Sequence, residues 1–373
     1  MKVLYLPAAL ALSLPHLASA QLRLDFTGRP DAVIGEGFSQ VAGIRELPGN
    51  LAVVTDQLER GVFLVNFAAK ARSQIGRQGD GPGEYRFPMA PLAGLADTTW
   101  IVDATLRRIH ILAPDGKIVS SRPLPTSGVP GGLLTARGTD RAGRIYFEGN
   151  GFDAQTGRFI DSVAVVRWTP ETDRSETLTR VWNGGRVIFD RPEGKSSMAR
   201  TVTPFPHLDT WTALPAGGIA VILHDPFRIQ VPDQDNTART RAPIPYTPIP
   251  IAAADREEFR RGTSNRTSAI RRDGGSGPPG QGPQFLDQDF PKAMPPFIAA
   301  SVRAAPNGEI WVGRSYAAAD RTRRYDIFDS QGRPLGTATL GANSTVVGFG
   351  IGTVYLARLD PADDLIYLER HRR

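Results

Sequence analysis

One structural unit recurs six times along this chain and limits the folds open to it. Each copy has a turn with Gly or Asp, a short strand rich in β-branched and aromatic residues, a polar break and a second strand. Three of the five intervals are 48, 46 and 44 residues, near the roughly 40 to 50 residues of a four-stranded propeller blade, and the other two are 74 and 91. The copies begin at Gly49, Asp97, Gly143, Gly217, Gly308 and Gly352.

A partner strand follows each copy across a tight turn. In Pro114-Asp115-Gly116-Lys117, for example, the glycine supplies the positive φ that a hairpin turn needs. A β-sandwich also has short strands, but it has no reason to repeat one strand-turn-strand signature six times. We therefore predict an all-β fold, a six-bladed β-propeller of four-stranded antiparallel blades. The predicted partner strands are residues 61–66, 108–112, 163–168, 228–231, 324–328 and 365–370.

The last blade needs a strand from elsewhere in the chain. Its own unit supplies three strands, residues 346–349, 354–359 and 365–370, and three strands leave an open edge that favours association. Residues 22–26 alternate apolar and polar side chains and belong to no other unit. We predict that this N-terminal strand completes the last blade and closes the ring.

One blade carries a motif specific enough to suggest a family. Residues 75–88 read Ile-Gly-Arg-Gln-Gly-Asp-Gly-Pro-Gly-Glu-Tyr-Arg-Phe-Pro, and a strand ending at Asp103 and a second beginning at Arg108 follow. This pattern resembles the inter-blade loop and blade of NHL-repeat propellers, with Glu84 where that pattern usually has Gln. The resemblance implies an exported bacterial six-bladed propeller and an ion pair between Asp103 and Arg108. It implies no particular activity.

The first twenty residues have the features of a secretory signal peptide. Lys2 precedes an apolar stretch over residues 3–18, and Ala18-Ser19-Ala20 fits the cleavage rule for small residues. We predict cleavage before Gln21, a single domain over residues 21–373, and a periplasmic or secreted location. The chain has no cysteine, which excludes disulfides, thiolate metal sites and a lipid anchor, and no second apolar run is long enough to span a membrane.

The charge of the chain bears on its partners. The formal net charge is +6, and the basic residues are spread over the whole sequence instead of forming one patch. Dispersal and the export signal argue against nucleic acid as a partner. We expect a monomer that meets an envelope protein, an anionic glycan or a small anionic ligand.

Two long segments lie between blades, at residues 169–206 and 243–296. In the second, residues 252–261 predict a short helix ended by Gly262, and residues 274–283 contain enough Gly and Pro to predict a flexible stretch. Long loops are either functional or plain linkers, so a lid over one face and a linker are both open.

Several catalytic motifs are missing or incomplete. The glycines at 79, 81 and 83 precede a strand, so they predict a structural turn and not a phosphate-binding loop. No Gly-x-Ser-x-Gly elbow occurs, and residues 233–236 begin like a calcium loop but lack the Glu at its twelfth position. The histidines show no zinc-like spacing, and acidic residues gather in the last hairpin: His110, His207, His224 and His371; Asp360, Asp363 and Asp364.

The architecture itself brings one set of residues together. In a propeller, the turns after the second strand of each blade meet on one face around the central channel. We predict a ligand-binding site there with acids on three neighbouring blades and cations on the following ones. Its members are Asp56, Asp103, Glu148 with Asn150, His224 with Asp225, Arg314 and Arg358.

Two functions are compatible with that ring. The first is a non-catalytic platform in the cell envelope that binds a ligand or a protein, because no complete catalytic motif is present. The alternative is a divalent-metal-dependent, lactonase-like hydrolase or lyase with its ion, such as Ca²⁺, held by Asp56, Asp103, Glu148 and Asn150 at the channel. The sequence does not decide whether the chain is an enzyme, and it assigns no catalytic residue.

Overall fold

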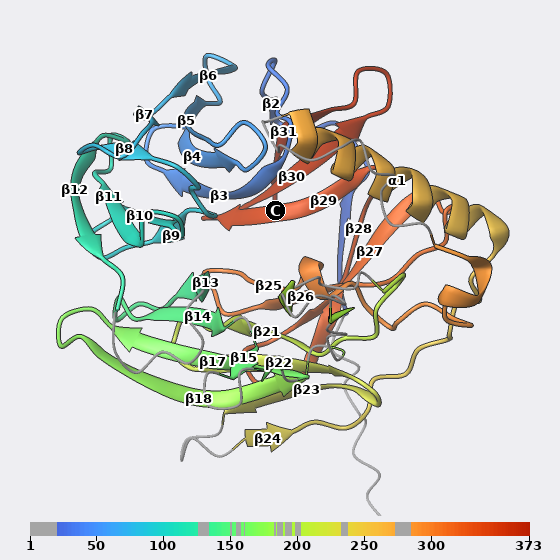
Figure 1. The fold of residues 1–373 in the computed structure, drawn as a ribbon. Helices are drawn as coiled ribbons and strands as arrows, with labels where there is room; N and C mark the ends of the chain where they lie inside the picture. Colours follow the sequence, from blue (N-terminus) through green and yellow to red (C-terminus); the bar gives the residue numbers. More distant parts are fainter. Residues whose placement is uncertain are drawn as a thin grey trace, which may run out of the picture.

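The computed structural model confirms the six-bladed β-propeller. Each blade is a sheet of four antiparallel strands, and six such sheets surround a common centre (Figure 1). The structure describes residues 21–125, 134–149, 151–153, 158–159, 161–182, 184, 189–190, 196–197, 203–232, 238–272 and 285–373. The predicted signal peptide and the glycine-rich residues 274–283 lie outside these ranges.

The first three blades follow the chain order from the centre outward. Blade one contains β3 (Val41–Leu47), β4 (Leu51–Asp56), β5 (Gly61–Asn66) and β6 (Ala71–Gln74). Blade two contains β9 (Leu92–Ala93), β10 (Thr99–Asp103), β11 (Arg108–Leu112) and β12 (Ile118–Pro123). Blade three contains β13 (Leu134–Thr139), β14 (Ile145–Gly149), β17 (Ser162–Thr169) and β18 (Arg174–Trp182).

The other three blades repeat this pattern. Blade four contains β21 (Thr210–Ala213), β22 (Ile219–His224), β23 (Phe227–Pro232) and β24 (Ala238–Thr240). Blade five contains β25 (Arg303–Ala304), β26 (Ile310–Gly313), β27 (Thr322–Phe328) and β28 (Pro334–Gly341). Blade six contains β29 (Ser344–Gly350), β30 (Thr353–Asp360) and β31 (Leu365–Arg372), and it takes its fourth strand, β2 (Ala32–Val33), from the other end of the chain.

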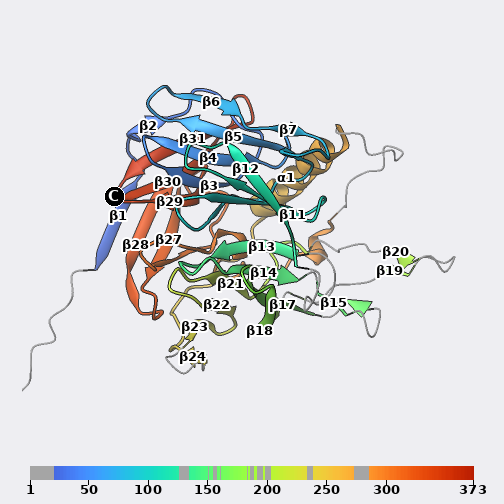
Figure 2. The same ribbon diagram turned by 90° about the vertical axis from the view of Figure 1, so that its left-hand side faces the viewer.

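Ring closure by an N-terminal strand is therefore confirmed, but the strand is not residues 22–26. Ala32 and Val33 pair with Arg370 and Glu369, and backbone bonds from residues 31–38 continue along β31. The predicted clasp forms β1 (Leu22–Phe26), which instead lies parallel to β28 as a fifth strand on blade five (Figure 2). The alternation of β1 identified a strand with one buried face, but it carried no information on which sheet edge that face would meet.

A glycine allows β1 to approach blade five. A Cβ atom at Gly336 would lie only 1.9 Å from the carbonyl oxygen of Leu22. Any side chain at this position would push β1 away from β28, so the parallel pairing depends on Gly336.

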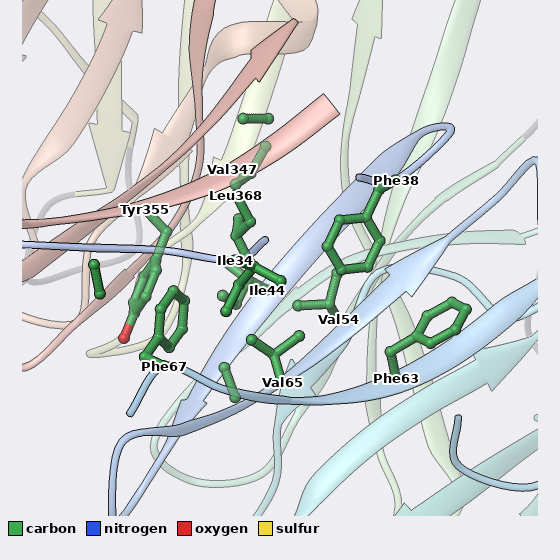
Figure 3. Close-up of a cluster of buried hydrophobic side chains, with 13 residues drawn as sticks. Ile34, Phe38, Ile44, Val54, Phe63, Val65, Phe67, Val347, Tyr355 and Leu368 are labelled. Atoms are coloured by element: carbon green, nitrogen blue, oxygen red, sulfur yellow. The ribbon is translucent and has the colours of Figure 1, made fainter. Parts of the chain in front are cut away.

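Apolar side chains fill the spaces between neighbouring blades. One cluster joins blades one and six, and its members point toward one another from both sheets (Figure 3). Ile34 and Phe38, from the segment that closes the ring, are fully buried within it. The closing segment is thus held by side-chain burial as well as by its backbone bonds.

Polar side chains reinforce the same seam. Glu46 on β3 accepts hydrogen bonds from the Thr353 hydroxyl at 2.6 Å, the Tyr355 hydroxyl at 2.5 Å and the Ile351 backbone N–H at 3.0 Å. Burial and this carboxylate raise the pKa of Tyr355, so the phenol stays protonated and donates.

The two faces of the ring differ. The additional elements lie together on one face, which we call the insertion face (Figure 2). The opposite face carries the turns between the first and second strands of the blades, and we call it the hairpin face. The additional elements are the β7 (Arg77–Gln78) and β8 (Glu84–Tyr85) pair, the β15 (Phe152–Asp153) and β16 (Arg158–Phe159) pair, the β19 (Phe189–Asp190) and β20 (Ser196–Ser197) pair, and α1 (Ala253–Arg272).

The predicted helix in the second insertion is present but longer than expected. It continues through Gly262 to Arg272, so the prediction that Gly262 ends it was wrong. A mid-helix glycine costs only about 1 kcal/mol relative to alanine, which the remaining turns can offset. Asp255 fixes the helix start by accepting hydrogen bonds from the N–H groups of Ala252 at 2.7 Å and Ala318 at 2.6 Å.

The rest of this insertion includes two short 3₁₀ helices, η1 (Asp287–Asp289) and η2 (Ala299–Ser301). Phe259 of α1 packs against Phe205, Phe285 and Phe290. Whether the insertion acts as a lid stays a prediction. In the described part of the chain, no helix has both the length and the apolar character needed to cross a membrane.

A charge pair near the end of the chain provides a test of the contact between blades five and six. Arg373 donates to both carboxylate oxygens of Glu309 in blade five, at 2.5 and 2.6 Å, and Trp311 donates to the same group. Glu309→Gln should lower the free energy of unfolding by about 1–3 kcal/mol, because it breaks a partly buried charge-assisted pair. Chemical denaturation measures this change.

Arg372→Ala is the matched control. The Arg372 side chain is 80% exposed and lies 3.8 Å from its nearest carboxylate, Asp31. Its loss should change the unfolding free energy by less than about 0.5 kcal/mol. Equal effects of the two substitutions would show that the Glu309 pair does not stabilise the contact between blades five and six.

Candidate functional site

The predicted ring residues are considered first, beginning with Asp56. Its buried carboxylate accepts four backbone N–H bonds, from Ser39 at 2.7 Å and from Gln40, Leu58 and Glu59 at 2.9 Å each. Burial raises the pKa of Asp56, although the amide donors act in the opposite direction. The carboxylate therefore joins the turn after β4 to the segment that precedes β3.

Asp103 repeats this arrangement one blade later. It accepts N–H bonds from Arg86 at 2.6 Å, Phe87 at 3.3 Å, Thr105 at 3.0 Å and Leu106 at 2.9 Å. The same aspartate position thus has the same role in blades one and two: it satisfies the amides of its own turn and of the incoming chain.

The expected ion pair between Asp103 and Arg108 is wrong. Arg108 donates through Nη2 to the carbonyl oxygens of Asp80, Gly81 and Glu84 at 3.3, 3.0 and 2.7 Å. It stabilises the glycine-rich loop from within, which agrees with the structural interpretation of that loop. Arg108 binds the loop carbonyls and Asp103 binds the amides of its turn and of the incoming chain, so the two side chains do not pair.

Glu148 lies at the junction of blades three and four. Its Oε2 accepts a hydrogen bond from Arg137 Nη1 at 2.6 Å and another from Trp211 Nε1 at 2.9 Å. Arg137 also donates to the Thr210 hydroxyl at 3.2 Å. The predicted neighbour of Glu148, Asn150, lies outside the described residues.

His224 is held by a residue that the sequence analysis did not single out. Its Nδ1 lies 2.6 Å from Asp209 Oδ1, and the same oxygen accepts the His224 backbone N–H at 2.9 Å. Trp182 stacks on the imidazole with ring centroids 5.0 Å apart, and the His207 ring lies 6.0 Å away at a right angle. No spacing signal links these residues, because the fold brings them together from the ends of β18 and β22 and from the segment before β21.

The two predicted arginines, Arg314 and Arg358, each pair with a carboxylate. Arg314 lies 3.3 Å from Asp326 Oδ2, and its guanidinium stacks over Phe227. Arg358 pairs with Glu369 at 2.7 Å. Asp225, beside His224, is exposed.

Metal ligation can be assessed from the carboxylates. Among the residues that the structure describes, no group of three His, Asp or Glu side chains is arranged to hold an ion. Asp363 of the last hairpin accepts a hydrogen bond from Tyr367, and Asp360 lies near Arg358. The calcium-like residues 233–236 lie outside the described residues.

The inner strands enclose a cavity of about 1040 Å³ along the ring axis. Its lining comes from the hairpin-face half of all six inner strands and from the turns that follow them. Exposed turn residues such as Pro48, Ala96 and Ile351 belong to this lining, so the cavity opens on the hairpin face. The predicted ring lies at the turns of the opposite face.

Four arginines line this cavity. Three come from the inner strands of blades one, three and five, Arg45 on β3, Arg137 on β13 and Arg303 on β25, and the fourth, Arg141, lies in the turn after β13. Side chains alternate along a strand, so Glu46 faces blade six while Arg45 faces the other way, toward blade two, where the charge of Asp97 acts on it. Arg137 and Arg303 likewise reach the next blade, at the Thr210 hydroxyl and the Val346 carbonyl, so each guanidinium group lies at a seam beside the cavity.

Two of these arginines have no acidic partner among the described residues. Arg45 donates from Nη1 to the Glu46 backbone carbonyl, and its buried Nε has no partner. Arg303 donates from Nε to the Val346 carbonyl at 2.9 Å. Burial lowers the pKa of both guanidinium groups, and the charge of Arg137 lowers that of Arg303 further.

The acidic residues of the lining offset these charges only in part. Asp97, exposed at the mouth, and Glu46 both act on Arg45 through their charges. Asp140 accepts hydrogen bonds from Arg144 at 2.7 Å and from the Tyr146 hydroxyl at 2.8 Å. The lining carries four arginines against these three acids, an excess of one positive charge.

Sequence reasoning missed this site. Nothing in the sequence distinguishes Arg45, Arg137 and Arg303 from the many other arginines, since the blade register decides which side chains of an inner strand lie beside the axis. The available signal was position: Arg45 and Arg303 each lie three residues before a Pro in the turn that starts the next repeated strand.

Comparisons with known proteins complete the description of the site. No family model and no curated protein sequence matches the chain. Among solved structures, a proposed gluconolactonase is 13% identical with a TM-score of 0.48, over 93% of this chain and 94% of that one. A proposed exported protein from Bacteroides fragilis is 12% identical (TM-score 0.46, 94% and 100% covered), and the calcium-binding protein regucalcin from Agrobacterium tumefaciens is 13% identical (TM-score 0.45, 94% and 97%).

These values assign neither an activity nor a ligand to the chain. What defines its class is its own sheet order together with the site: a six-bladed propeller with a cationic axial cavity.

The turn aspartates provide a test of their structural role. Asp103→Ala removes the acceptor of four backbone N–H groups and should lower the free energy of unfolding by at least about 2 kcal/mol. Asp115→Ala, in an exposed turn where the carboxylate accepts the Lys117 N–H, should cost less than about 1 kcal/mol. Thermal or denaturant unfolding compares the two, and equal losses would contradict the role assigned to Asp103.

Proposed function

We propose that this chain binds an anionic ligand in its axial cavity. The observation that carries this proposal is the pair Arg45 and Arg303, two guanidinium groups that line the cavity without a carboxylate partner among the described residues. The proposal agrees with the predicted binding function and with an anionic ligand. It differs from the prediction in the face of the ring that the ligand enters.

The energetics support an anion at this position. A charged group removed from water is costly unless a counter-charge or hydrogen bonds compensate it. Each of these arginines keeps donors that no described residue uses, and Arg137 adds positive charge nearby. A carboxylate or phosphate on the axis would accept hydrogen bonds from more than one blade.

The predicted site on the insertion face stays a prediction. Asp56 and Asp103 are each engaged by four amides, and Glu148 by Arg137 and Trp211, so a ligand there would have to compete with these contacts. The cavity needs no such rearrangement. For this reason we place the ligand at the hairpin face.

We further propose that the protein is exported, as an NHL-like propeller of the cell envelope. The support is the sequence of residues 1–20, whose cleavage would leave Gln21 at the mature N-terminus. Mass spectrometry of protein from the periplasm and the medium tests this location. Full-length protein confined to the cytoplasm would contradict it.

Binding can be tested with inorganic phosphate as the probe. Titration at low ionic strength, followed by ³¹P NMR, should give an affinity that Arg303→Met and Arg45→Met each weaken about tenfold, because each removes charge-assisted hydrogen bonds. Added NaCl should weaken binding to the parent protein as well.

Arg77→Met is the matched control, since the Arg77 side chain is 80% exposed and lies in a loop on the insertion face. It should leave the phosphate affinity unchanged. If both cavity variants bind phosphate as the parent does, the cavity is not the anion site.

A second candidate function is the lactonase-like hydrolase or lyase. The observation that favours it is the His224–Asp209 pair, in which the carboxylate orients the imidazole and leaves Nε2 without a described partner, the arrangement of a general base. The name gluconolactonase describes the compared structure. For this chain it only suggests lactones as a substrate class to assay.

Hydrolysis of δ-lactones and carboxylic esters, with and without Ca²⁺, tests this candidate. If it holds, His224→Asn should abolish turnover and Asp209→Asn should lower kcat with little change in KM. His110→Asn is a control, since that imidazole is buried in blade two. Turnover that survives His224→Asn would exclude this general base, and turnover indifferent to EDTA would exclude the metal.

A further inference from the structure

We propose that the ligand of the axial cavity is an amphiphilic anion, with one carboxylate or phosphate head among the arginines and an apolar group toward the mouth. This inference rests on the proposed function, because it names the ligand class of the same site. The observations that support it are the size of the cavity, the apolar character of its mouth and the depth of its charges.

The cavity is much larger than a small inorganic anion requires. Its volume of about 1040 Å³ corresponds to the pockets that proteins use for whole organic molecules, roughly 300–1,000 Å³. A phosphate ion alone would leave most of the lining in contact with water. A ligand that fills the space must therefore carry a sizeable group besides its charge.

Apolar side chains predominate at the mouth of the cavity, beside the charged Asp97 and Arg141. Five of the six hairpin turns bring an apolar side chain to its lining: Pro48, Leu95, Pro215, Pro306 and Ile351. Turns in this position usually carry polar residues. Blade three is the exception, since its turn contributes Arg141.

Two of these side chains are unusually exposed for their type. Ile351 is 93% exposed and Leu95 is 40% exposed, and both line the same opening. Phe349, near the end of β29, lies two residues before the turn residue Ile351 and also lines the cavity. Exposed apolar side chains gathered around one opening are typical of a surface that an apolar partner covers.

The charges lie deeper than this apolar mouth. Arg45 and Arg303 are each three residues before the turn prolines Pro48 and Pro306, which at about 3.3 Å per residue places their backbone roughly 10 Å further into the ring. A ligand that satisfies both zones enters with its charged head first. Its apolar part then lies against the turns.

The charge balance favours one anionic head. The lining holds four arginines, Arg45, Arg137, Arg141 and Arg303, against three acids, Glu46, Asp97 and Asp140, which leaves an excess of one positive charge. A carboxylate or a phosphate monoester carries one to two negative charges, enough to balance it. A polyanion such as an acidic glycan would meet too few cations here and an apolar mouth that it could not use.

A series of sodium carboxylates with 2, 6, 8 and 10 carbons tests the inference, using the mature protein, residues 21–373, and isothermal titration calorimetry below the micelle concentrations. Affinity should rise about three- to fourfold for each added CH₂ that is buried. Decanol is the neutral counterpart of decanoate, and it should bind at least tenfold more weakly because it lacks the charged head.

Variants separate the two zones. Ile351→Ser and Leu95→Ser should flatten the increase with chain length while leaving the phosphate affinity unchanged, and Arg303→Met should weaken every member of the series. Leu286→Ser is the matched control, because Leu286 is 59% exposed but lies in the second insertion, away from the cavity. Unfolding temperatures confirm that the variants are folded.

The outcomes distinguish the two proposals. If phosphate and acetate bind through Arg303 but affinity does not rise with chain length, the anion site stands and the amphiphilic ligand is excluded. If decanol binds as tightly as decanoate, the head has no role and this inference fails. If neither phosphate nor any carboxylate binds, the proposed function and this inference fail together.

Discussion

The structure depends on one pairing between distant parts of the chain. Residues 31–38 lie along β31, and over three hundred residues separate the partners in sequence. Without that segment, blade six would present a three-stranded sheet with an open edge, and the seam between blades one and six would lose Ile34 and Phe38 from its apolar cluster. The axial cavity exists only because the seam is closed, since all six inner strands contribute to its wall.

The sequence predicts the outer architecture well and the inner surface poorly, for a physical reason. The second and third strands of each blade are buried on both sides and joined by tight turns, so β-rich runs and glycines identify them. Two of the inner strands, β9 and β25, have only two residues each. Which of their side chains face the axis follows from how each blade pairs and tilts, and Arg303 therefore has no sequence signature of its own.

The predicted ring shows how one residue type can serve two purposes. An aspartate at the end of a second strand has the chemistry of a ligand, and Asp56 and Asp103 lie where a propeller often has functional residues. The structure gives each of them four amide donors, which is a complete set of partners for a carboxylate. The spacing of the repeats predicted their position around the ring, but only the structure shows that turn and loop amides already bind their carboxylates.

Arg45 and Glu46 are consecutive on β3 and both line the cavity, but Arg45 faces blade two and Glu46 binds blade six. The same short strand is thus a wall of the binding space and an anchor of the closed ring. A molecule that fixes β3 from the axis also restricts the strand that Tyr355 and Thr353 hold from the side. Occupancy and ring integrity are therefore thermodynamically linked. A molecule that binds only the closed ring raises the free energy needed to open the ring.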